Sequence, residues 1–177
     1  MAITQYSTPT LDEHVKAIGW LCIKWAHIEL MLNQFIILLT PIYDEDIQKS
    51  LTSNMSMSDK IKVVDALTFI RRPSDGAHEA VRSLLNMIDN ELRPERNKCV
   101  HDFWGVGAEG AIRTHEKSKI KKPQANQPLE LITHETVLVS SDEIWGLVTK
   151  VNETTAALMT SYVQYHKHMT KPSVSSQ

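Results

Sequence analysis

The most hydrophobic region of the chain lies within residues 11–39, which read LDEHVKAIGWLCIKWAHIELMLNQFIILL. Apolar residues recur there at intervals of three, four and seven, which is the period of one helical face. They are Ile18, Leu21, Cys22, Trp25, Ile28, Leu32, Phe35, Ile36 and Leu39. A second stripe is formed by Trp20, Ile23, Leu30, Met31, Ile37 and Leu38. A helix that is apolar on more than one side lies at the centre of a fold or buries a face against a partner.

Shorter elements are expected after this helix, which should end at Thr40 because the residue before a proline disfavours helix. Residues 43–54 predict one short helix, and Ser56 or Ser58 caps the next. A turn follows at residues 73–76, where proline and glycine occur together. The core residues predicted for the helix before this turn are Ile61, Val64, Leu67 and Ile70.

A strongly periodic helix then runs over residues 81–92 and meets Pro94. Proline lacks a backbone N–H and disfavours helix at the residue before it. We therefore expect the axis to kink or restart there, with the restarted piece running over residues 95–104.

The helical period disappears after Gly105. Residues 111–120 and 129–139 carry β-branched side chains around a polar loop and predict a two-stranded ribbon. Ser140 or Ser141 then caps a long final helix. Its predicted inward residues are Ile144, Leu147, Val148, Val151, Leu158, Met159 and Tyr162.

These patterns predict a mainly α protein, an antiparallel helical bundle with a small β-hairpin excursion before the last helix. We expect one domain over residues 11–168, with a β-ribbon insertion at 105–139. Polar tails are expected at residues 1–10 and 169–177.

The composition is that of an ordinary globular protein, with 42% hydrophobic and 23% charged residues and a formal net charge of −2. Such a charge excludes a chain-wide attraction to nucleic acid or anionic lipid. Cys22 and Cys99 are too few for a disulfide framework and favour a reducing compartment. Because charged and amide side chains interrupt residues 18–39, we expect a buried helix of a cytoplasmic protein with no membrane segment.

The segment that could carry chemistry spans residues 93–104 and reads RPERNKCVHDFW. On a helix Asn97 and His101 share a face, and the long side chain of Arg96 can reach it. We expect this cation, amide and imidazole to gather at a helix start. Cleavage of a phosphodiester by a neighbouring 2′-hydroxyl needs such a set, because an imidazole exchanges a proton near neutral pH and a guanidinium stabilises phosphoryl oxygens.

The arrangement Arg-Asn-x-x-x-His late in a helical bundle resembles the R-x4-6-H motif of HEPN domains, where a polar residue commonly follows the arginine. The stretches Trp25-Ala26-His27-Ile28-Glu29 and Ser58-Asp59-Lys60-Ile61 also resemble bacterial HEPN-type proteins. The resemblance covers residues 11–104 and the last helix.

This resemblance implies a helical bundle that homodimerises through the motif face and often cleaves RNA without a metal. Such enzymes leave a 2′,3′-cyclic phosphate and a 5′-hydroxyl. Many belong to toxin–antitoxin or phage-defence systems, and others have lost activity and only bind. The leading hypothesis is therefore a dimeric endoribonuclease, with Arg96, Asn97 and His101 as its catalytic residues. The alternatives are a catalytically silent dimerisation or adaptor domain and a nucleotide-binding helper of a nucleotidyltransferase. An antitoxin or a nucleotidyltransferase is a candidate partner.

A structural alternative exists for the motif. Arg96 could be a surface ion-pair residue, and His101 a residue that a helix C-terminus favours through its dipole. A second Arg–His pair, Arg72 and His78, fits the looser spacing, but a predicted turn separates the two residues.

Glu29 lies on the first apolar stripe, where an unpaired carboxylate is costly, so we expect a partner. Arg93, Arg96 and His101 are the candidates, and a role in orienting the site competes with a purely structural pair. We expect Cys99 to pack beside Val100 and not to act as a nucleophile. The sequence contains no pattern that predicts a metal site or a cofactor.

One basic stretch stands out in this slightly acidic chain, at residues 113–122. Contacts from lysine and arginine to phosphates add RNA affinity that does not depend on sequence and weakens with salt. A solvated, solubilising hairpin is the competing interpretation. The candidate RNA-binding residues are Arg113, Lys117, Lys119, Lys121 and Lys122.

Overall fold

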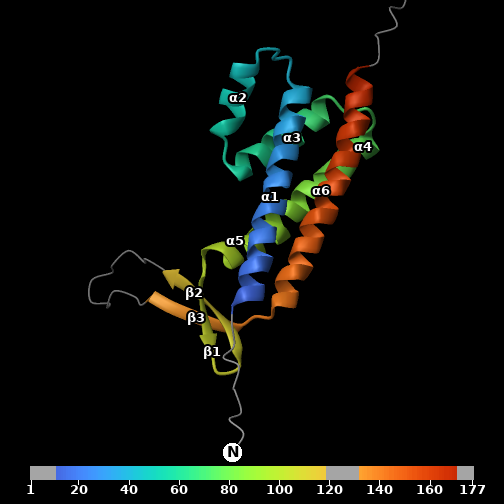
Figure 1. Ribbon diagram of the computed structural model, residues 1–177. Helices are drawn as coiled ribbons and strands as arrows, with labels where there is room; N and C mark the ends of the chain where they lie inside the picture. Colours follow the sequence, from blue (N-terminus) through green and yellow to red (C-terminus); the bar gives the residue numbers. More distant parts are fainter. Residues whose placement is uncertain (1–10, 119–131, 171–177) are drawn as a thin grey trace, which may run out of the picture.

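Two long helices form the axis of the molecule in the computed structural model, which describes residues 11–118 and 132–170. The first, α1 (Asp12–Leu39), packs against the last, α6 (Ser141–Met169). Figure 1 shows α1 and α6 side by side and running in the same direction, with the helices α4 and α5 returning in the opposite one. The predicted mainly α fold with a small sheet before the last helix is confirmed.

Two helices, α2 and α3, connect α1 to the segment of α4 and α5 that runs in the opposite direction. The short α2 (Glu45–Ser53) begins where the Asp44 carboxylate accepts hydrogen bonds from two backbone N–H groups. In α3 (Met57–Ile70) the cap is Ser56, whose hydroxyl accepts from the Asp59 N–H at 3.2 Å. Ile61 and Val64 are buried as predicted, but Ile70 is 68% exposed because it is the last residue of α3 and extends beyond the core.

The returning arm is one continuous helical unit made of α4 (Asp75–Met87), a π-helical turn η1 (Ile88–Leu92) and α5 (Arg93–His101). Pro94 does not restart the helix. Instead, the Arg93 N–H bonds to the Ile88 carbonyl, five residues back, so the extra residue of the π-turn accommodates the missing proline donor. The expected helical piece to residue 104 is too long, since α5 ends at His101.

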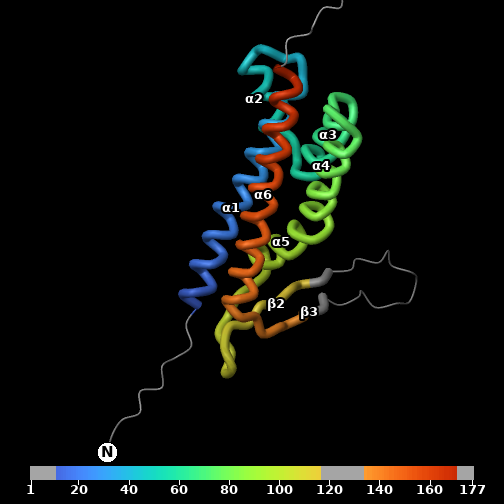
Figure 2. The backbone as a smooth tube through the Cα atoms, turned by 90° about the vertical axis from the view of Figure 1, so that its right-hand side faces the viewer, coloured from blue at the N-terminus to red at the C-terminus, as the bar shows by residue number. Residues whose placement is uncertain are grey.

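A three-stranded antiparallel sheet follows, in the order β1 (Phe103–Gly107), β2 (Gly110–Ser118) and β3 (Ile132–Leu138). The prediction of two strands missed β1, because a five-residue strand with two glycines carries little β signal of its own. The backbone of Asp102, the residue after α5, is extended, and Phe103 then pairs with Thr114. Figure 2 shows β3 leading into the start of α6, with the sheet at the same end of the bundle as the start of α1.

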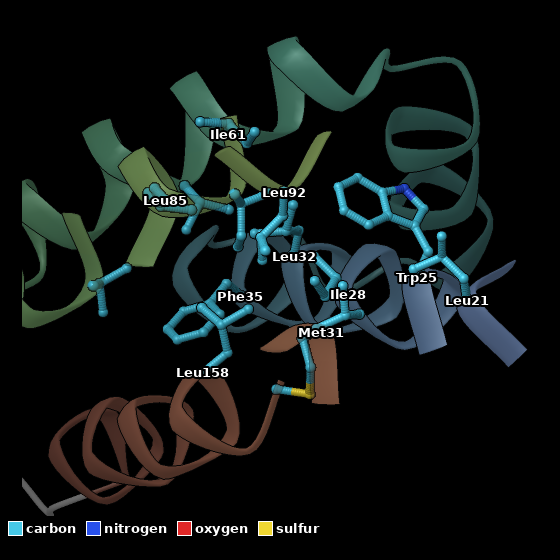
Figure 3. Close-up of a cluster of buried hydrophobic side chains, with 14 of the residues drawn as sticks. Leu21, Trp25, Ile28, Met31, Leu32, Phe35, Ile61, Leu85, Leu92 and Leu158 are labelled. Carbon is cyan, nitrogen blue, oxygen red and sulfur yellow. The ribbon is translucent and has the colours of Figure 1, made fainter. Parts of the chain in front are cut away.

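The core lies between α1, α6 and the returning arm. Phe35 is fully buried and meets the rings of Tyr162 and Tyr165 edge-on, at centroid distances of 5.5 and 5.9 Å. Figure 3 shows side chains of this cluster converging from several helices. Those it labels are Leu21, Trp25, Ile28, Met31, Leu32, Phe35, Ile61, Leu85, Leu92 and Leu158.

The start of α6 is fixed by a reciprocal capping box between Ser140 and Glu143. Most predicted inward residues of α6 pack as expected, but Met159 is 51% exposed. Tyr165, which the sequence did not single out, is fully buried and donates to the Thr68 carbonyl at 3.0 Å. The helix turns residue 165 toward Phe35 and residue 159 toward solvent.

By length and hydropathy alone, α1 qualifies as a helix that could cross a membrane. In this fold one side of α1 is buried from Ala17 to Leu39 against its neighbours. The other side exposes Trp20, Ile23 and Leu30, at 44%, 51% and 53%. The predicted second apolar stripe is therefore partly a surface, although Met31 is buried.

Candidate active site at the end of helix α5

Arg96, Asn97 and His101 gather in the last two turns of α5, and His101 is its final residue. One guanidinium nitrogen, Arg96 Nη1, lies 3.2 Å from Asn97 Oδ1 and 3.4 Å from His101 Nε2. The expected cluster is thus present. It stands at the end of a helix rather than at a start, because α5 is the tail of the returning arm.

The contact between Arg96 and His101 defines which atoms can react. A guanidinium only donates, so His101 Nε2 must accept and must carry a lone pair. His101 is exposed, so a hydroxyl from solvent or substrate can approach the ring. The geometry therefore presents an accessible imidazole nitrogen beside a guanidinium, a pairing that can remove a proton near a phosphate.

Arg96 is held between α5 and α1. Its guanidinium carbon lies 5.8 Å from the centre of the Trp25 ring. Arg96 Nε is buried without a hydrogen-bond partner, and Arg96 forms no ion pair among the described residues. The interpretation of Arg96 as a surface ion-pair residue therefore has no support, whereas His101 does lie at a helix C-terminus.

The expected supporting residues do not join the cluster. Arg93 pairs with Asp89 on its own helical arm, at 2.9 Å. Glu29 lies at the edge of the buried side of α1 and is only partly buried. Within the described part of the chain Glu29 forms no ion pair, so the expected bond to Arg93, Arg96 or His101 is wrong. A carboxylate that retains water needs no such partner.

A second polar cluster adjoins the motif, and the sequence did not predict it. The side chain of Asp102 is only 5% exposed. Its Oδ1 lies 2.6 Å from His115 Nδ1, and its Oδ2 lies 3.4 Å from Arg113 Nε. Both partners come from β2, two residues apart and so on one face of the strand. A signal existed in the alternation of Arg113 and His115, but the register that brings them to Asp102 requires β1.

The basic stretch divides between described and undescribed residues. Arg113 is held by Asp102 with its side chain 15% exposed, which turns this cation inward. Lys117 belongs to β2, opposite Thr133. Lys119, Lys121 and Lys122 lie outside the described residues. The RNA-binding role of this stretch stays a prediction.

A cavity of about 540 Å³ separates α5 and the sheet from α6. Cys99, Arg113 and Val137 line it together with Ile144 and Leu147. Cys99 is buried as predicted, and burial raises the pKa of its thiol, so it is a packing residue and not a thiolate nucleophile. Trp104 Nε1 donates to the Cys99 carbonyl at 2.9 Å and ties β1 to the end of α5.

Within residues 11–118 and 132–170 no three side chains of histidine, cysteine, aspartate or glutamate gather in a metal-binding group. No family model, curated protein or solved structure significantly matches the chain. The arguments below therefore rest on the residues and their geometry.

Proposed function

We propose that this protein is a metal-independent endoribonuclease of the HEPN type. It cleaves RNA by attack of a 2′-hydroxyl on the adjacent phosphorus, leaving 2′,3′-cyclic phosphate and 5′-hydroxyl ends. The observation that supports this most directly is the contact of Arg96 Nη1 with His101 Nε2 at the exposed end of α5. The resemblance of the Arg96–Asn97–His101 spacing to the family motif points the same way.

In the proposed reaction, His101 Nε2 accepts the proton of the attacking 2′-hydroxyl. Arg96 donates hydrogen bonds to the phosphoryl oxygens as negative charge develops on them. Asn97 accepts from Arg96 Nη1 and so orients the guanidinium. These roles move the proton and stabilise the charge with side chains alone.

The partner proposed for the catalytic chain is a second copy of itself. The family resemblance implies contact through the motif face, and the exposed part of the second α1 stripe, at Trp20, Ile23 and Leu30, offers a further apolar face that a second copy could cover. Ultracentrifugation at micromolar concentration should show a dimer, and replacing Ile23 and Leu30 with Glu should shift it to monomer. A monomeric wild type at that concentration contradicts this part of the proposal.

RNA binding is proposed to draw further on the basic stretch around Lys119, Lys121 and Lys122. Contacts of this kind would be independent of sequence and sensitive to salt. The setting proposed is a cytoplasmic toxin or phage-defence system, with an antitoxin or nucleotidyltransferase as a further partner.

The decisive experiment incubates purified protein with mixed RNA in EDTA. New fragments should appear with 5′-hydroxyl ends. A polynucleotide kinase should label these ends with ATP directly, without prior removal of a phosphate. Their 3′ ends should be cyclic phosphates by mass spectrometry. Loss of cleavage in EDTA with rescue by magnesium would contradict the mechanism.

A second candidate function is a catalytically silent dimerisation or adaptor domain of the same fold. Exposed apolar side chains near α2 and at the end of α3 favour it: Tyr43, Ile47, Phe69 and Ile70 are 93%, 54%, 53% and 68% exposed. A partner that covered these side chains would remove apolar surface from water. If wild-type protein cleaves no RNA in any buffer, this function replaces the first.

A further inference from the structure

The Asp102 carboxylate stands directly after the candidate base in the chain and is almost completely buried. A buried carboxylate is costly unless it is paired and hydrogen-bonded. Here His115 and Arg113 approach one oxygen each, at 2.6 and 3.4 Å. The shorter contact is to the histidine, in the range of a charge-assisted hydrogen bond.

This contact fixes the orientation of the His115 ring. A carboxylate can only accept, so Nδ1 must donate to Asp102 Oδ1. The other ring nitrogen, Nε2, is then the one that can take up or release a proton. The His115 side chain is 42% exposed, so the ring is accessible although its partner is buried. A buried carboxylate that orients an accessible imidazole is the arrangement by which proteins prepare a histidine for proton transfer.

His115 is also placed close to His101 by the chain. The register of β1 and β2 pairs Phe103 with Thr114, so its continuation sets Asp102 opposite His115. Consecutive Cα atoms are about 3.8 Å apart, and opposite Cα atoms in an antiparallel pair are about 4.5–5.5 Å apart. The Cα atoms of His101 and His115 are therefore within about 9 Å by addition. Two imidazoles at that separation can reach either side of one phosphodiester.

The sheet face that carries His115 is the one turned to α5. Arg113 and Val137 share this face, and both line the cavity beside Cys99 of α5. The side chain of Trp104, opposite Arg113 in register, bonds back to the end of α5. His115 thus belongs to the sheet face that meets α5, the helix that carries Arg96 and His101.

We infer that His115, oriented by Asp102, is a second catalytic residue that protonates the leaving 5′-oxygen. This inference rests on the proposed endoribonuclease function and adds the general acid that the Arg–His motif lacks. The 2′-oxygen forms its bond to phosphorus and gives its proton to His101 Nε2. The bond from phosphorus to the 5′-oxygen breaks, and that oxygen takes the proton from His115 Nε2. Exchange of both protons with water restores the starting states.

The different roles of His101 and His115 follow from the side chains that contact them, Arg96 and Asp102. Arg96 can only donate to His101, which keeps a lone pair on that ring. Asp102 can only accept from His115, which keeps a proton on Nδ1 and turns Nε2 of that ring away from the carboxylate. Asp102 is a positioning residue in this scheme, and its second oxygen forms an ion pair with Arg113 at 3.4 Å without a hydrogen bond.

A substrate with sulfur in place of the bridging 5′-oxygen tests the assignment. A thiolate leaves without being protonated, so a general acid is dispensable for that substrate. His115→Ala should lower cleavage of ordinary RNA about 10²–10⁴-fold and leave cleavage of the 5′-thio RNA close to wild type. His101→Ala should lower cleavage of both. Asp102→Asn should resemble His115→Ala more mildly, with recovery on the 5′-thio RNA.

His134→Ala is the matched control, because His134 is an exposed histidine on β3, opposite Glu116 and outside the Asp102 cluster. It should cleave both substrates like wild type. His115→Gln, with a thermal unfolding curve for each variant, separates a folding defect from a catalytic one.

Three outcomes overturn the inference. If His115→Ala and His115→Gln cleave ordinary RNA like wild type, His115 has no role while the proposed function stands. If they are equally impaired on both substrates, His115 is not the acid. If wild type cleaves neither substrate, the proposed function itself has failed.

Discussion

Two arginine–histidine pairs of similar spacing, Arg72 with His78 and Arg96 with His101, have opposite environments in the fold. Arg72 pairs with Asp75 at 2.6 Å and covers the Phe69 ring, while His78 is buried on α4. His78 Nδ1 meets the Thr68 hydroxyl at 3.2 Å, and Asp65 lies 3.8 Å from its other nitrogen. Arg96 and His101 instead contact each other, and His101 remains exposed.

The difference shows what an arginine–histidine spacing can and cannot specify. The turn after α3 separates Arg72 from His78, so each finds partners of its own and the histidine joins a buried network. On α5 no turn intervenes, and the two side chains share one helix end. We therefore expect the first pair to affect stability and the second to affect activity.

The largest expected effect is on RNA cleavage. His101→Ala and Arg96→Ala should each reduce it about 10²–10⁴-fold, because one removes the base and the other the charge-stabilising donor. Initial rates on a defined RNA in EDTA measure this. Arg72→Ala, the equivalent change in the other pair, should cleave like wild type. Equal losses from Arg72→Ala and Arg96→Ala would remove the distinction between the two pairs.

The next effect is on stability. His78→Ala should lower the free energy of unfolding by about 1–3 kcal/mol, since it leaves a cavity and a buried hydroxyl with one partner fewer. Urea unfolding followed by circular dichroism measures it, with the exposed neighbour Glu79→Ala as control. The cleavage rate per folded molecule should not change. An unfolding curve like that of wild type would show that the buried network contributes nothing.

A smaller effect should come from Tyr165, which donates to the carbonyl of Thr68 in the same network. Tyr165→Phe should cost about 1 kcal/mol at neutral pH, the usual net value of a hydrogen bond. Burial also raises the pKa of Tyr165, so the unfolded chain loses this proton at lower pH than the folded one. Stability should therefore fall as pH rises above about 10. The variant should lose less stability over that range, and parallel curves for both proteins would contradict this.

The smallest expected effect is that of Asn97→Ala, a few-fold loss of cleavage. The amide oxygen only orients Arg96 Nη1, and the guanidinium keeps its contact with Trp25 without it. The loss should appear in kcat more than in KM, because orientation matters most as charge develops. A loss as large as that of His101→Ala would give Asn97 a direct role in proton transfer.

Much of the fold was predictable because its signals are local. The period of α1, the stop at Thr40 and the Ser140 cap all depend on residues within one or two turns of each other. The same holds for the gathering of Arg96, Asn97 and His101, which needs only the geometry of one helix. Glu29 was misjudged because its burial depends on how far α5 covers α1, which no local pattern encodes.

The sequence by itself determined the long helices, the cap regions of α3 and α6 and the spacing of the motif, since hydrophobic period and hydrogen-bonding side chains act over a few residues. It did not predict that α4 begins at Asp75, inside the expected turn, with Ser74 as its cap. Only the tertiary structure decided that Pro94 is absorbed by a π-turn and that residues 103–107 pair as a strand. It also brought Asp102 to His115, thirteen residues further along the chain. Strand register and the burial of a charge are set by contacts between distant segments, and such contacts exist only once the chain has packed.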